Sequence, residues 1–306
     1  MGRHHLRAIA STGVSTVVGV ADPAASAEDL GSALPPGARV YSQASDMLAE
    51  QRLDVVHIVT PPATHTRLAL LALDAGCHVY VEKPFTSTSE EAQLILNTAR
   101  ARGLTVCAGH QVLFESPALA VWDALGSIGT LVHVESYFSF KMVRRTITPV
   151  EQLQDILPHA VYPLVEQLRV GTGLLHDPIE IVGTSLTADG NAYVLLKLGS
   201  VTGIVLVTLT GRPVEQYQSI VGTNGSLRPD YIGGGMAALV GPGTGPGVLL
   251  TPYRRAMRVV GGTNRGVWRL LRGGSYPGLR ELVRRFTSAS ASARRRRCRP
   301  SRSSTL

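Results

Sequence analysis

The sequence predicts an α/β protein with two domains: a parallel sheet covered by helices, followed by an α+β domain built on a largely antiparallel sheet. In the first third of the chain, short apolar runs alternate with helical patterns. Such alternation is typical of a parallel sheet with helices on both faces. After about residue 130, strand-like runs follow one another, and turn dipeptides separate several of them, as in an antiparallel sheet.

The predicted parallel strands are four apolar runs: residues 17–22 (VVGVAD), 54–59 (DVVHIV), 78–82 (HVYVE) and 104–109 (LTVCAG). Between them, helical patterns cover residues 64–75, which carry a stripe of leucines, and residues 87–102. Ser89 is the predicted N-cap of the second helix, because Glu90 and Glu91 after it suit the positive end of the helix dipole.

The later strands are predicted from LVHVESYFSF, IEIVGTSLTA, AYVLLKL, VTGIVLVTLT and YQSIVGT. Asp189-Gly190 and Asn224-Gly225 predict hairpins, since both dipeptides tolerate a positive φ. Residues 201–210 alternate apolar residues with threonines, so we expect this sheet to have one covered and one open face. Residues 234–247 are glycine-rich and are predicted to be irregular, and residues 252–286 are predicted to form basic helical pieces.

These patterns place the first domain in residues 1–109 and the second in residues 110–290. Residues 291–306 hold six arginines and no acidic residue, so they account for most of the formal net charge of +8. We expect them to form a disordered basic tail. Nonspecific contact of this tail with nucleic acid is an alternative role, but the folded part shows no DNA-binding motif.

Composition narrows the class of protein. The hydrophobic fraction of 44% and the charged fraction of 17% are those of a globular chain, and no apolar run approaches the roughly 18 residues of a membrane span. The three cysteines form no CxxC pattern, so we expect neither a disulfide framework nor a metal site. Polar residues interrupt the first 27 residues, which argues against a signal peptide and predicts a cytoplasmic protein.

Polar residues follow three of the predicted parallel strands at their carboxyl ends, where open α/β sheets bind ligands. Asp22 ends the first strand, Thr60-Pro61-Pro62 follows the second, and Glu82-Lys83-Pro84 follows the third. A carboxylate such as Asp22 can accept hydrogen bonds from an adenosine ribose and repels a 2′-phosphate, although alone it is also an ordinary turn residue. Together, the three strand ends predict a ligand site at this edge.

Residues 54–86, DVVHIVTPPATHTRLALLALDAGCHVYVEKPFT, resemble the core signature of the Gfo/Idh/MocA oxidoreductases, a family of two-domain NAD(P)-dependent dehydrogenases. The matching pattern is a strand ending in TP, a His, AL-x-AG, HV and EKP. It is carried by Thr60, Pro61, His65, Ala72, Leu73, Ala75, Gly76, His78, Val79, Glu82, Lys83 and Pro84. The resemblance continues through AGHQVLFESPAL and IGTLVHVES to VGTNGSL, up to about residue 230, and implies that the first domain is Rossmann-like.

The resemblance implies a catalytic role for Lys83. In this family the EKP lysine lies beside the nicotinamide and the substrate hydroxyl, and the proline is commonly cis. An ammonium there would stabilise the alkoxide that develops as hydride leaves carbon. Glu82 and Pro84 are then expected to position Lys83. Together with Lys83, the implied cofactor-binding residues are Gly2, Asp22, Thr60, Pro61, His65, Glu82 and Pro84.

The family's second signature, Asp-x-x-x-His on a helix, matches Asp155 and His159 in DILPH. A four-residue spacing places both side chains on one helix face. The match implies that His159 takes a proton from the substrate and that Asp155 either orients the imidazole or lies beside the same hydroxyl. By spacing alone, an N-cap aspartate and a half-buried histidine explain the pair better than a catalytic pair does, and the family match is what favours the functional role. The glycines usual before the Asp are absent, and Pro163 predicts a kink.

The family's first strand and GxGxxG loop, which bind the pyrophosphate at a helix N-terminus, have only a partial counterpart here. Gly2 stands in the place of the last glycine, and the first strand and the other glycines are not in this sequence. The favoured explanation is a recorded start that is too late; the alternative is a degenerate copy.

The predicted function is transfer of hydride between NAD, with NADP less favoured, and a hydroxyl of a sugar, sugar nucleotide or polyol. The alternatives are a non-catalytic regulator that binds a nucleotide or sugar, and an inactive truncated copy. The family also implies a homo-oligomer that pairs through the open sheet face, with no membrane association.

Overall fold

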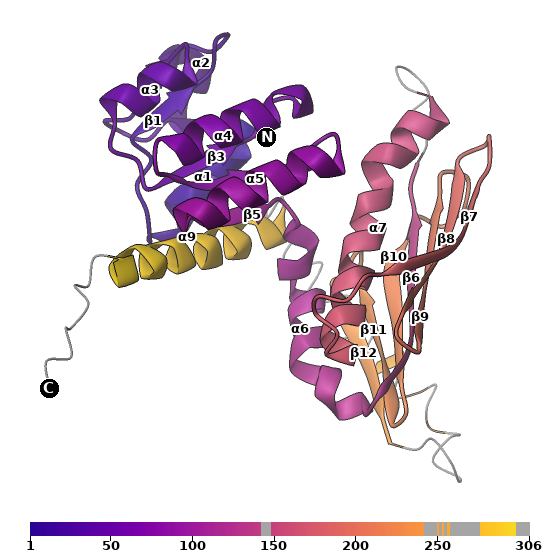
Figure 1. Cartoon of the computed structure of the whole chain (residues 1–306). Coiled ribbons are helices and arrows are strands. Elements are labelled where there is room, and N and C mark those ends of the chain that lie inside the picture. The colour runs from indigo at the N-terminus through magenta and orange to yellow at the C-terminus, as the bar shows by residue number, and fades with distance from the viewer. Residues whose placement is uncertain (142–147, 242–249, 251–252, 254–255, 258–275, 298–306) are drawn as a thin grey trace, which may run out of the picture. The chain divides into compact units, whose positions relative to one another are not determined.

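The computed structural model describes residues 1–141, 148–241, 250, 253, 256–257 and 276–297 (Figure 1). Its contacts divide the chain into two compact units. The first contains Met1–Gln111 together with the C-terminal helix from Leu279, and the second is Val112–Gly278. Each unit has its own apolar core.

The first unit has parallel strands in two hydrogen-bonded groups. Strands β1 (Gly19–Ala21) and β2 (Arg39–Tyr41) form one, and β3 (Val55–Ile58), β4 (His78–Val81) and β5 (Val106–Ala108) form the other in that order. The helices are α1 (Gly2–Thr12), α2 (Ala27–Leu30), α3 (Ala44–Glu50), α4 (His65–Asp74), α5 (Ser89–Arg102) and α9 (Pro277–Arg297). Short 3-10 turns cover Gly31–Ala33, Pro62–Thr64 and Gln111–Phe114. The predicted Rossmann-like α/β fold of this unit is confirmed.

Successive side chains of β3 and β4 point to opposite faces of the sheet, so each face has its own set of contacts. Ile58, Val79 and Val81 point to one face and pack on apolar residues of α4 and α5. His57 and Tyr80 are register partners on the opposite face, where they meet α1 and α9. One face of the sheet is therefore an apolar core, and the other carries polar rings.

The second unit is a seven-stranded sheet in the order β12-β11-β10-β6-β9-β8-β7. Neighbouring strands are antiparallel except β6 and β9, which are parallel. The strands are β6 (Leu131–Ser139), β7 (Glu180–Leu186), β8 (Asn191–Leu198), β9 (Val201–Thr208), β10 (Gln216–Gly222), β11 (Gly225–Asp230) and β12 (Gly235–Val240). The helices are α6 (Ser116–Ala124), continued by a 3-10 turn over Leu125–Ile128, and α7 (Pro149–Thr172).

Helix α7 lies along one face of this sheet, and α6 packs over β11 and β12 (Figure 1). In β9, Val201, Val205 and Val207 are buried while Ile204 is exposed. The strand β7 at the edge is exposed along its length. The predicted antiparallel sheet with one covered face is confirmed.

Two local predictions differ from the structure by one residue. Helix α5 is capped by Thr88, not Ser89, because Thr88 and Glu91 form a reciprocal capping box. The hairpin between β10 and β11 turns at Thr223 and Asn224, with Gly222 paired to Gly225. Gly225 is required in the strand itself, since a Cβ there would lie 2.3 Å from the backbone oxygen of Leu239.

The C-terminal part of the chain differs more. Residues 235–240, predicted to be irregular, form β12, because the edge of β11 supplies a partner for their backbone groups. Residues 279–290, assigned from the sequence to the second domain, pack on the first unit. The buried residues Leu279, Leu282, Val283 and Phe286 form the apolar stripe of α9 that explains this packing. The helix extends to Arg297, into the segment predicted to be disordered; residues 298–306 and most of 252–275 lie outside the described residues.

We expect Phe286→Ala to lower the free energy of unfolding of the first unit by about 3–5 kcal/mol, the usual cost of truncating a buried Phe. Phe286 is 5% exposed and contacts rings on β3 and β4. Urea-dependent hydrogen exchange of β3 and β4 measures the change. The exposed Ser288, altered to Ala, is the control on the same helix. Equal exchange in both variants would contradict the assignment of α9 to this unit.

Candidate functional site

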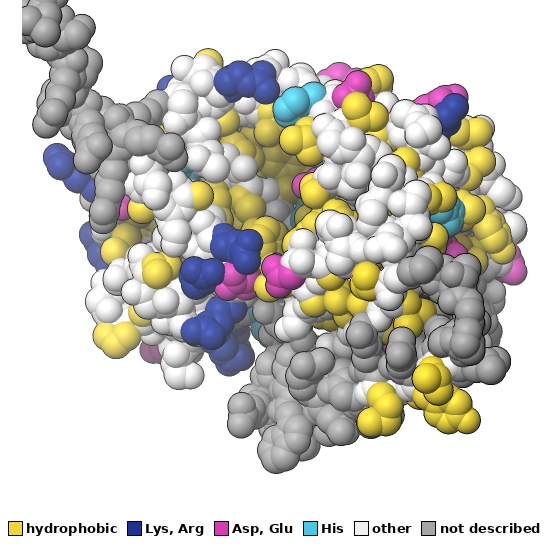
Figure 2. Space-filling view, turned by 90° about the horizontal axis from the view of Figure 1, so that it is seen from below, with side chains coloured by type: hydrophobic (Ala, Val, Ile, Leu, Met, Phe, Trp, Pro, Cys, Tyr) yellow, Lys and Arg dark blue, Asp and Glu magenta, His cyan; other side chains and the backbone are white. Residues whose placement is uncertain are grey.

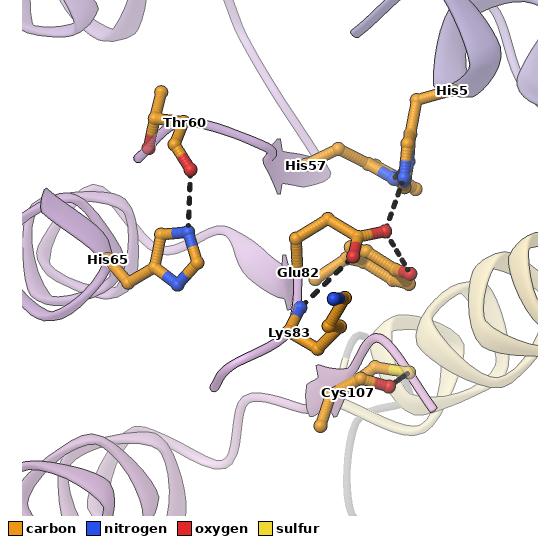
Figure 3. A network of polar contacts seen from close by, with 9 residues as sticks. His5, His57, Thr60, His65, Glu82, Lys83 and Cys107 are labelled. Carbon is orange, nitrogen blue, oxygen red and sulfur yellow. Dashed lines mark hydrogen bonds and ion pairs between the residues drawn. The ribbon is translucent and has the colours of Figure 1, made fainter. Parts of the chain in front are cut away.

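The turn that carries Lys83 leaves the carboxyl end of β4 and is held by the buried carboxylate of Glu82. Glu82 is 4% exposed, and its Oε2 accepts a hydrogen bond from the amide of Lys83 at 3.0 Å. The Lys83–Pro84 peptide bond is cis. In Figure 3, the side chain of Lys83 lies beside this carboxylate. The residue predicted to be catalytic therefore has its backbone fixed at the edge of the sheet.

The other oxygen of Glu82 is held from two directions. His5 of α1 donates from Nε2 to Oε1 at 2.9 Å, and the hydroxyl of Tyr80 donates to the same oxygen at 3.1 Å. His57 Nδ1 lies 3.2 Å from His5 Nδ1, and its ring stacks on Tyr80 with centroids 4.9 Å apart. Phe286 of α9 covers the rings of His57 and Tyr80. We call Glu82, His5, Tyr80, His57 and Phe286 the Glu82 cluster; Figure 3 labels Glu82, His5 and His57.

The ionisation of Glu82 and His57 is set by their burial and by the hydrogen-bond donors around them. Burial alone would raise the pKa of Glu82, but donors from His5, the Lys83 amide and Tyr80 outweigh it and hold this pKa below its ordinary value. Desolvation lowers the pKa of His57 to about 3; His5 adds to this shift and Glu82 opposes it. At neutral pH the cluster therefore contains a carboxylate and a neutral His57.

Gly109 completes the cluster from the end of β5. Its amide donates to the carbonyl oxygen of Val81 at 2.8 Å. A Cβ at this position would lie 2.9 Å from the Tyr80 hydroxyl and 3.1 Å from Glu82 Oε2, so any side chain would displace them. The neighbouring His110 has its pKa lowered by burial, while Glu82 opposes the shift.

His65 connects the loop after β3 with the turn after β4. The residue is completely buried. Its Nδ1 lies 2.8 Å from the carbonyl oxygen of Pro84, and its Nε2 lies 2.9 Å from that of Thr60 (Figure 3). Because the imidazole has no exposed surface, we expect it to shape the cofactor site through these two loops rather than by direct contact.

The remaining predicted cofactor residues lie at or just beyond the ends of helices and strands. Thr60 follows β3, with its hydroxyl 2.7 Å from that of Thr64, and the carbonyl oxygen of Pro61 accepts from the Thr64 amide. Gly2 begins α1, and a Cβ there would have ordinary contacts only. Asp22 follows β1 and is exposed; its Oδ1 accepts from the amide of Ala24 at 2.9 Å, as in a turn.

Asp155 and His159 lie one turn apart on α7, which runs through Pro158 and Pro163 as one helix. Asp155 is exposed and His159 is half-buried, with Nδ1 3.5 Å from the hydroxyl of Tyr162. Lys83 belongs to the first unit and this pair to the second. That Lys83 and His159 converge on one substrate oxygen stays a prediction.

Sequence reasoning did not assign roles to His5, His57, Tyr80, Gly109 or Phe286. One signal was available: His57 and Tyr80 interrupt apolar strands at positions that face the same side. A polar ring inside a buried strand requires partners on that side. Phe286 carried no such signal, because only the packing of α9 brings it to the cluster.

Comparison with known proteins identifies the family of the first domain. Residues 1–110 match the model of GFO_IDH_MocA, described as "Oxidoreductase family, NAD-binding Rossmann fold". This first domain belongs to the Gfo/Idh/MocA family. The resemblance predicted from the sequence is confirmed.

Two curated relatives illustrate how much of the chain matches known proteins. An uncharacterized oxidoreductase of Schizosaccharomyces pombe is 31% identical over 54% of this chain and 44% of its own length. A UDP-N-acetylglucosamine 3-dehydrogenase of Acidithiobacillus ferrooxidans is 27% identical over 77% of this chain and 75% of its own length. The chain thus spans less than half of the first relative and three quarters of the second.

A solved structure shows that the fold extends to the second unit. The WlbA dehydrogenase from Bordetella pertussis, in complex with NADH and UDP-GlcNAcA, superposes with a TM-score of 0.63 at 22% identity. The match covers 96% of this chain and 92% of that one. At this identity the likeness establishes the fold alone.

No helix in the described part of the chain has the length and apolar character needed to cross a membrane. In the same part of the chain, no three His, Cys, Asp or Glu residues are grouped so that they could hold a metal ion.

The low pKa of His57 has a consequence for stability. Unfolded His57 takes up a proton below pH about 6.5, whereas folded His57 does so only near pH 3, so its contribution is full above pH 6.5 and is lost as pH falls toward 3. Between pH 4 and 6.5, the slope of the unfolding free energy against pH reflects the extra protons that the unfolded chain binds. We expect His57→Gln to reduce this slope by an amount that corresponds to at most one bound proton. Urea denaturation at several pH values measures the slope.

The exposed His176, altered to Gln, is the control for this experiment and should keep the wild-type slope. Parallel curves for the wild type and His57→Gln would show that His57 is not held neutral in the fold.

Proposed function

We propose that this chain is a dehydrogenase that transfers hydride between a nicotinamide dinucleotide and a CH–OH carbon of a sugar, sugar nucleotide or polyol. The observation that carries the proposal is the placement of Lys83. It follows a buried strand of a Gfo/Idh/MocA domain, its amide is fixed by a buried carboxylate, and its turn is joined to the loop after β3 by His65.

Lys83 stabilises the substrate oxygen in the proposed mechanism. In the oxidative direction, His159 takes the proton of the reacting hydroxyl, and the Lys83 ammonium stabilises the negative charge that develops on that oxygen. Asp155, one turn from His159, orients the imidazole. The dinucleotide, when bound, supplies the hydride acceptor. In the reverse direction His159 returns its proton to the oxygen of the new alcohol, while the Lys83 ammonium stabilises the negative charge on that oxygen.

The residues at the carboxyl edge suit a dinucleotide. Asp22 presents a carboxylate at the end of β1, the chemistry that binds ribose hydroxyls. The start of α1 at Gly2 provides backbone N–H groups and a helix dipole for phosphate. Thr60 and Pro61 shape the loop after β3, which His65 joins to the turn of Lys83. We propose NAD as the preferred dinucleotide, because the charge of Asp22 repels the 2′-phosphate of NADP.

The names of relatives support the substrate class. The Acidithiobacillus relative is named for UDP-N-acetylglucosamine and one from Bacillus subtilis for scyllo-inositol, which are a sugar nucleotide and a polyol. We further propose a cytoplasmic homo-oligomer that pairs through the open face of the second sheet. The large apolar residues Tyr193 of β8 and Ile204 of β9, exposed on this face, support pairing.

Nucleic-acid binding, the alternative suggested by the basic tail, has less support than the dehydrogenase activity. The view in Figure 2 has Lys and Arg side chains interspersed with Asp and Glu rather than gathered in one basic area. On α9, Arg284 and Arg285 both pair with Glu281. On the face that Figure 2 shows, this mixture of charges does not favour nucleic-acid binding.

Lys83→Ala is expected to lower kcat about 100- to 1000-fold, the usual cost of removing one group that stabilises a developing oxyanion. Binding of NADH, followed by its own fluorescence, and binding of NAD, followed by calorimetry, should change much less. The exposed Lys197, altered to Ala, should behave as the wild type. Failure of the wild-type chain to bind any dinucleotide, or full activity of Lys83→Ala, would contradict the proposal.

The preference for NAD is tested separately with Asp22→Ser, which keeps an oxygen that can accept from the Ala24 amide. Loss of the charged hydrogen bond and of the repulsion should shift the ratio of kcat/KM for NAD over NADP toward NADP by roughly 10- to 100-fold. Steady-state kinetics with both dinucleotides gives this ratio. An unchanged ratio would remove Asp22 from the cofactor site.

A further inference from the structure

We propose that His5 is a positioning residue for Lys83, acting through the carboxylate of Glu82. The inference rests on the proposed function, because it assigns Lys83 to the reaction. His5 lies on α1, 77 residues before Glu82, and has no direct role in the mechanism given above. Its importance comes from what the Glu82 carboxylate holds.

Glu82 is fixed because both of its oxygens are engaged. Oε2 accepts from the amide of Lys83, and Oε1 accepts from His5 Nε2 and from the Tyr80 hydroxyl. These donors come from the turn, from α1 and from β4, so together they set both the position and the rotation of the carboxylate. Removal of His5 takes away a side-chain donor to Oε1.

Burial makes this donor more important than it would be in water. Glu82 is 4% exposed and His5 is 2% exposed. A buried carboxylate that loses a charge-assisted hydrogen bond either keeps an uncompensated charge, which is costly, or takes up a proton. A protonated Glu82 would hold the Lys83 amide less strongly, because a neutral acceptor forms a weaker bond.

The surroundings of His5 fix which way its ring donates. On β3, neutral His57 faces its Nδ1; on β4, Tyr80 and Glu82 face the ring. After β5, His110 is also close enough to interact with Glu82. On α9, Phe286 faces the cluster through His57 and Tyr80, while Glu281, Arg284 and Arg285 pair with one another. Among the charged and titratable groups named here, only Glu82 is an anion that His5 contacts.

The hydrogen bond between His5 and Glu82 links the proposed phosphate-binding helix to the turn of Lys83. Helix α1 begins at Gly2, where the proposed dinucleotide phosphate would bind, and His5 stands one turn further along the helix. A displacement of α1 therefore moves a donor of the carboxylate that holds Lys83. The position of the phosphate-binding helix and the position of the catalytic ammonium are thus coupled through one buried hydrogen bond.

The first test measures the ionisation of Glu82 by infrared difference spectroscopy, with Glu82→Gln used to assign the carboxyl band. In the wild type and in the exposed control Arg7→Gln, we expect Glu82 to remain ionised from pH 5 to 8. In His5→Leu it should take up a proton within this range. His5→Gln, which keeps a donor, should restore part of the ionisation. A carboxylate that stays ionised in His5→Leu overturns the proposal.

The second test uses kinetics. His5→Leu is expected to lower kcat about 10- to 100-fold with little change in KM, and to move the acidic limb of the kcat profile to higher pH. His5→Gln should recover part of kcat. A fall in kcat without any change in the pH profile would indicate a merely structural role and would overturn the assignment.

A third measurement needs no variant. Nitrogen-15 NMR of the wild-type chain should show a proton on His5 Nε2, the atom that faces Glu82. A bare Nε2 would overturn the proposal even if His5→Leu fails to fold. The infrared and NMR measurements require no substrate. If the wild type has no dehydrogenase activity, the proposed function fails, while these two measurements still decide whether His5 holds Glu82.

Discussion

Moving a carboxylate out of water costs several kcal/mol unless donors replace the lost hydration, and this cost governs the arrangement around Glu82. Each of its oxygens has a donor, and these donors arrive from α1, β4 and the Lys83 turn. Gly109 is required because a side chain there would occupy the same space. The edge of the sheet where Lys83 leaves β4 is therefore rigid for an electrostatic reason rather than through apolar packing alone.

Both ends of the described chain contribute to this region. Helix α1 supplies His5, and α9, more than 200 residues later, covers His57 and Tyr80 with Phe286. By excluding water, Phe286 strengthens the hydrogen bonds beneath it. On the opposite face of β3 and β4, α4 and α5 form an ordinary apolar core. One face of the sheet thus packs on an apolar core, and the other carries the buried polar cluster around Glu82.

Sequence periodicity was sufficient for the parallel strands and for the covered face of the second sheet, because burial imposes the alternation of Val201, Val205 and Val207 on the residues themselves. It placed Lys83, Thr60 and Asp22 at strand ends for the same reason. It did not find β12, whose strand depends on the edge of β11, or the docking of α9. Nor could it find the Glu82 cluster, since the contact between His5 and Glu82 exists only once α1 packs on the sheet.

The central claim is that the ammonium of Lys83 acts on the oxygen of a substrate alcohol beside a nicotinamide ring. A crystal structure of this chain with a reduced dinucleotide and an unreactive substrate analogue tests it most directly. The account predicts Lys83 Nζ and His159 Nε2 within hydrogen-bond distance of the same oxygen, with the Lys83 amide still on Glu82. A substrate bound elsewhere, with Lys83 Nζ directed into solvent, would contradict it.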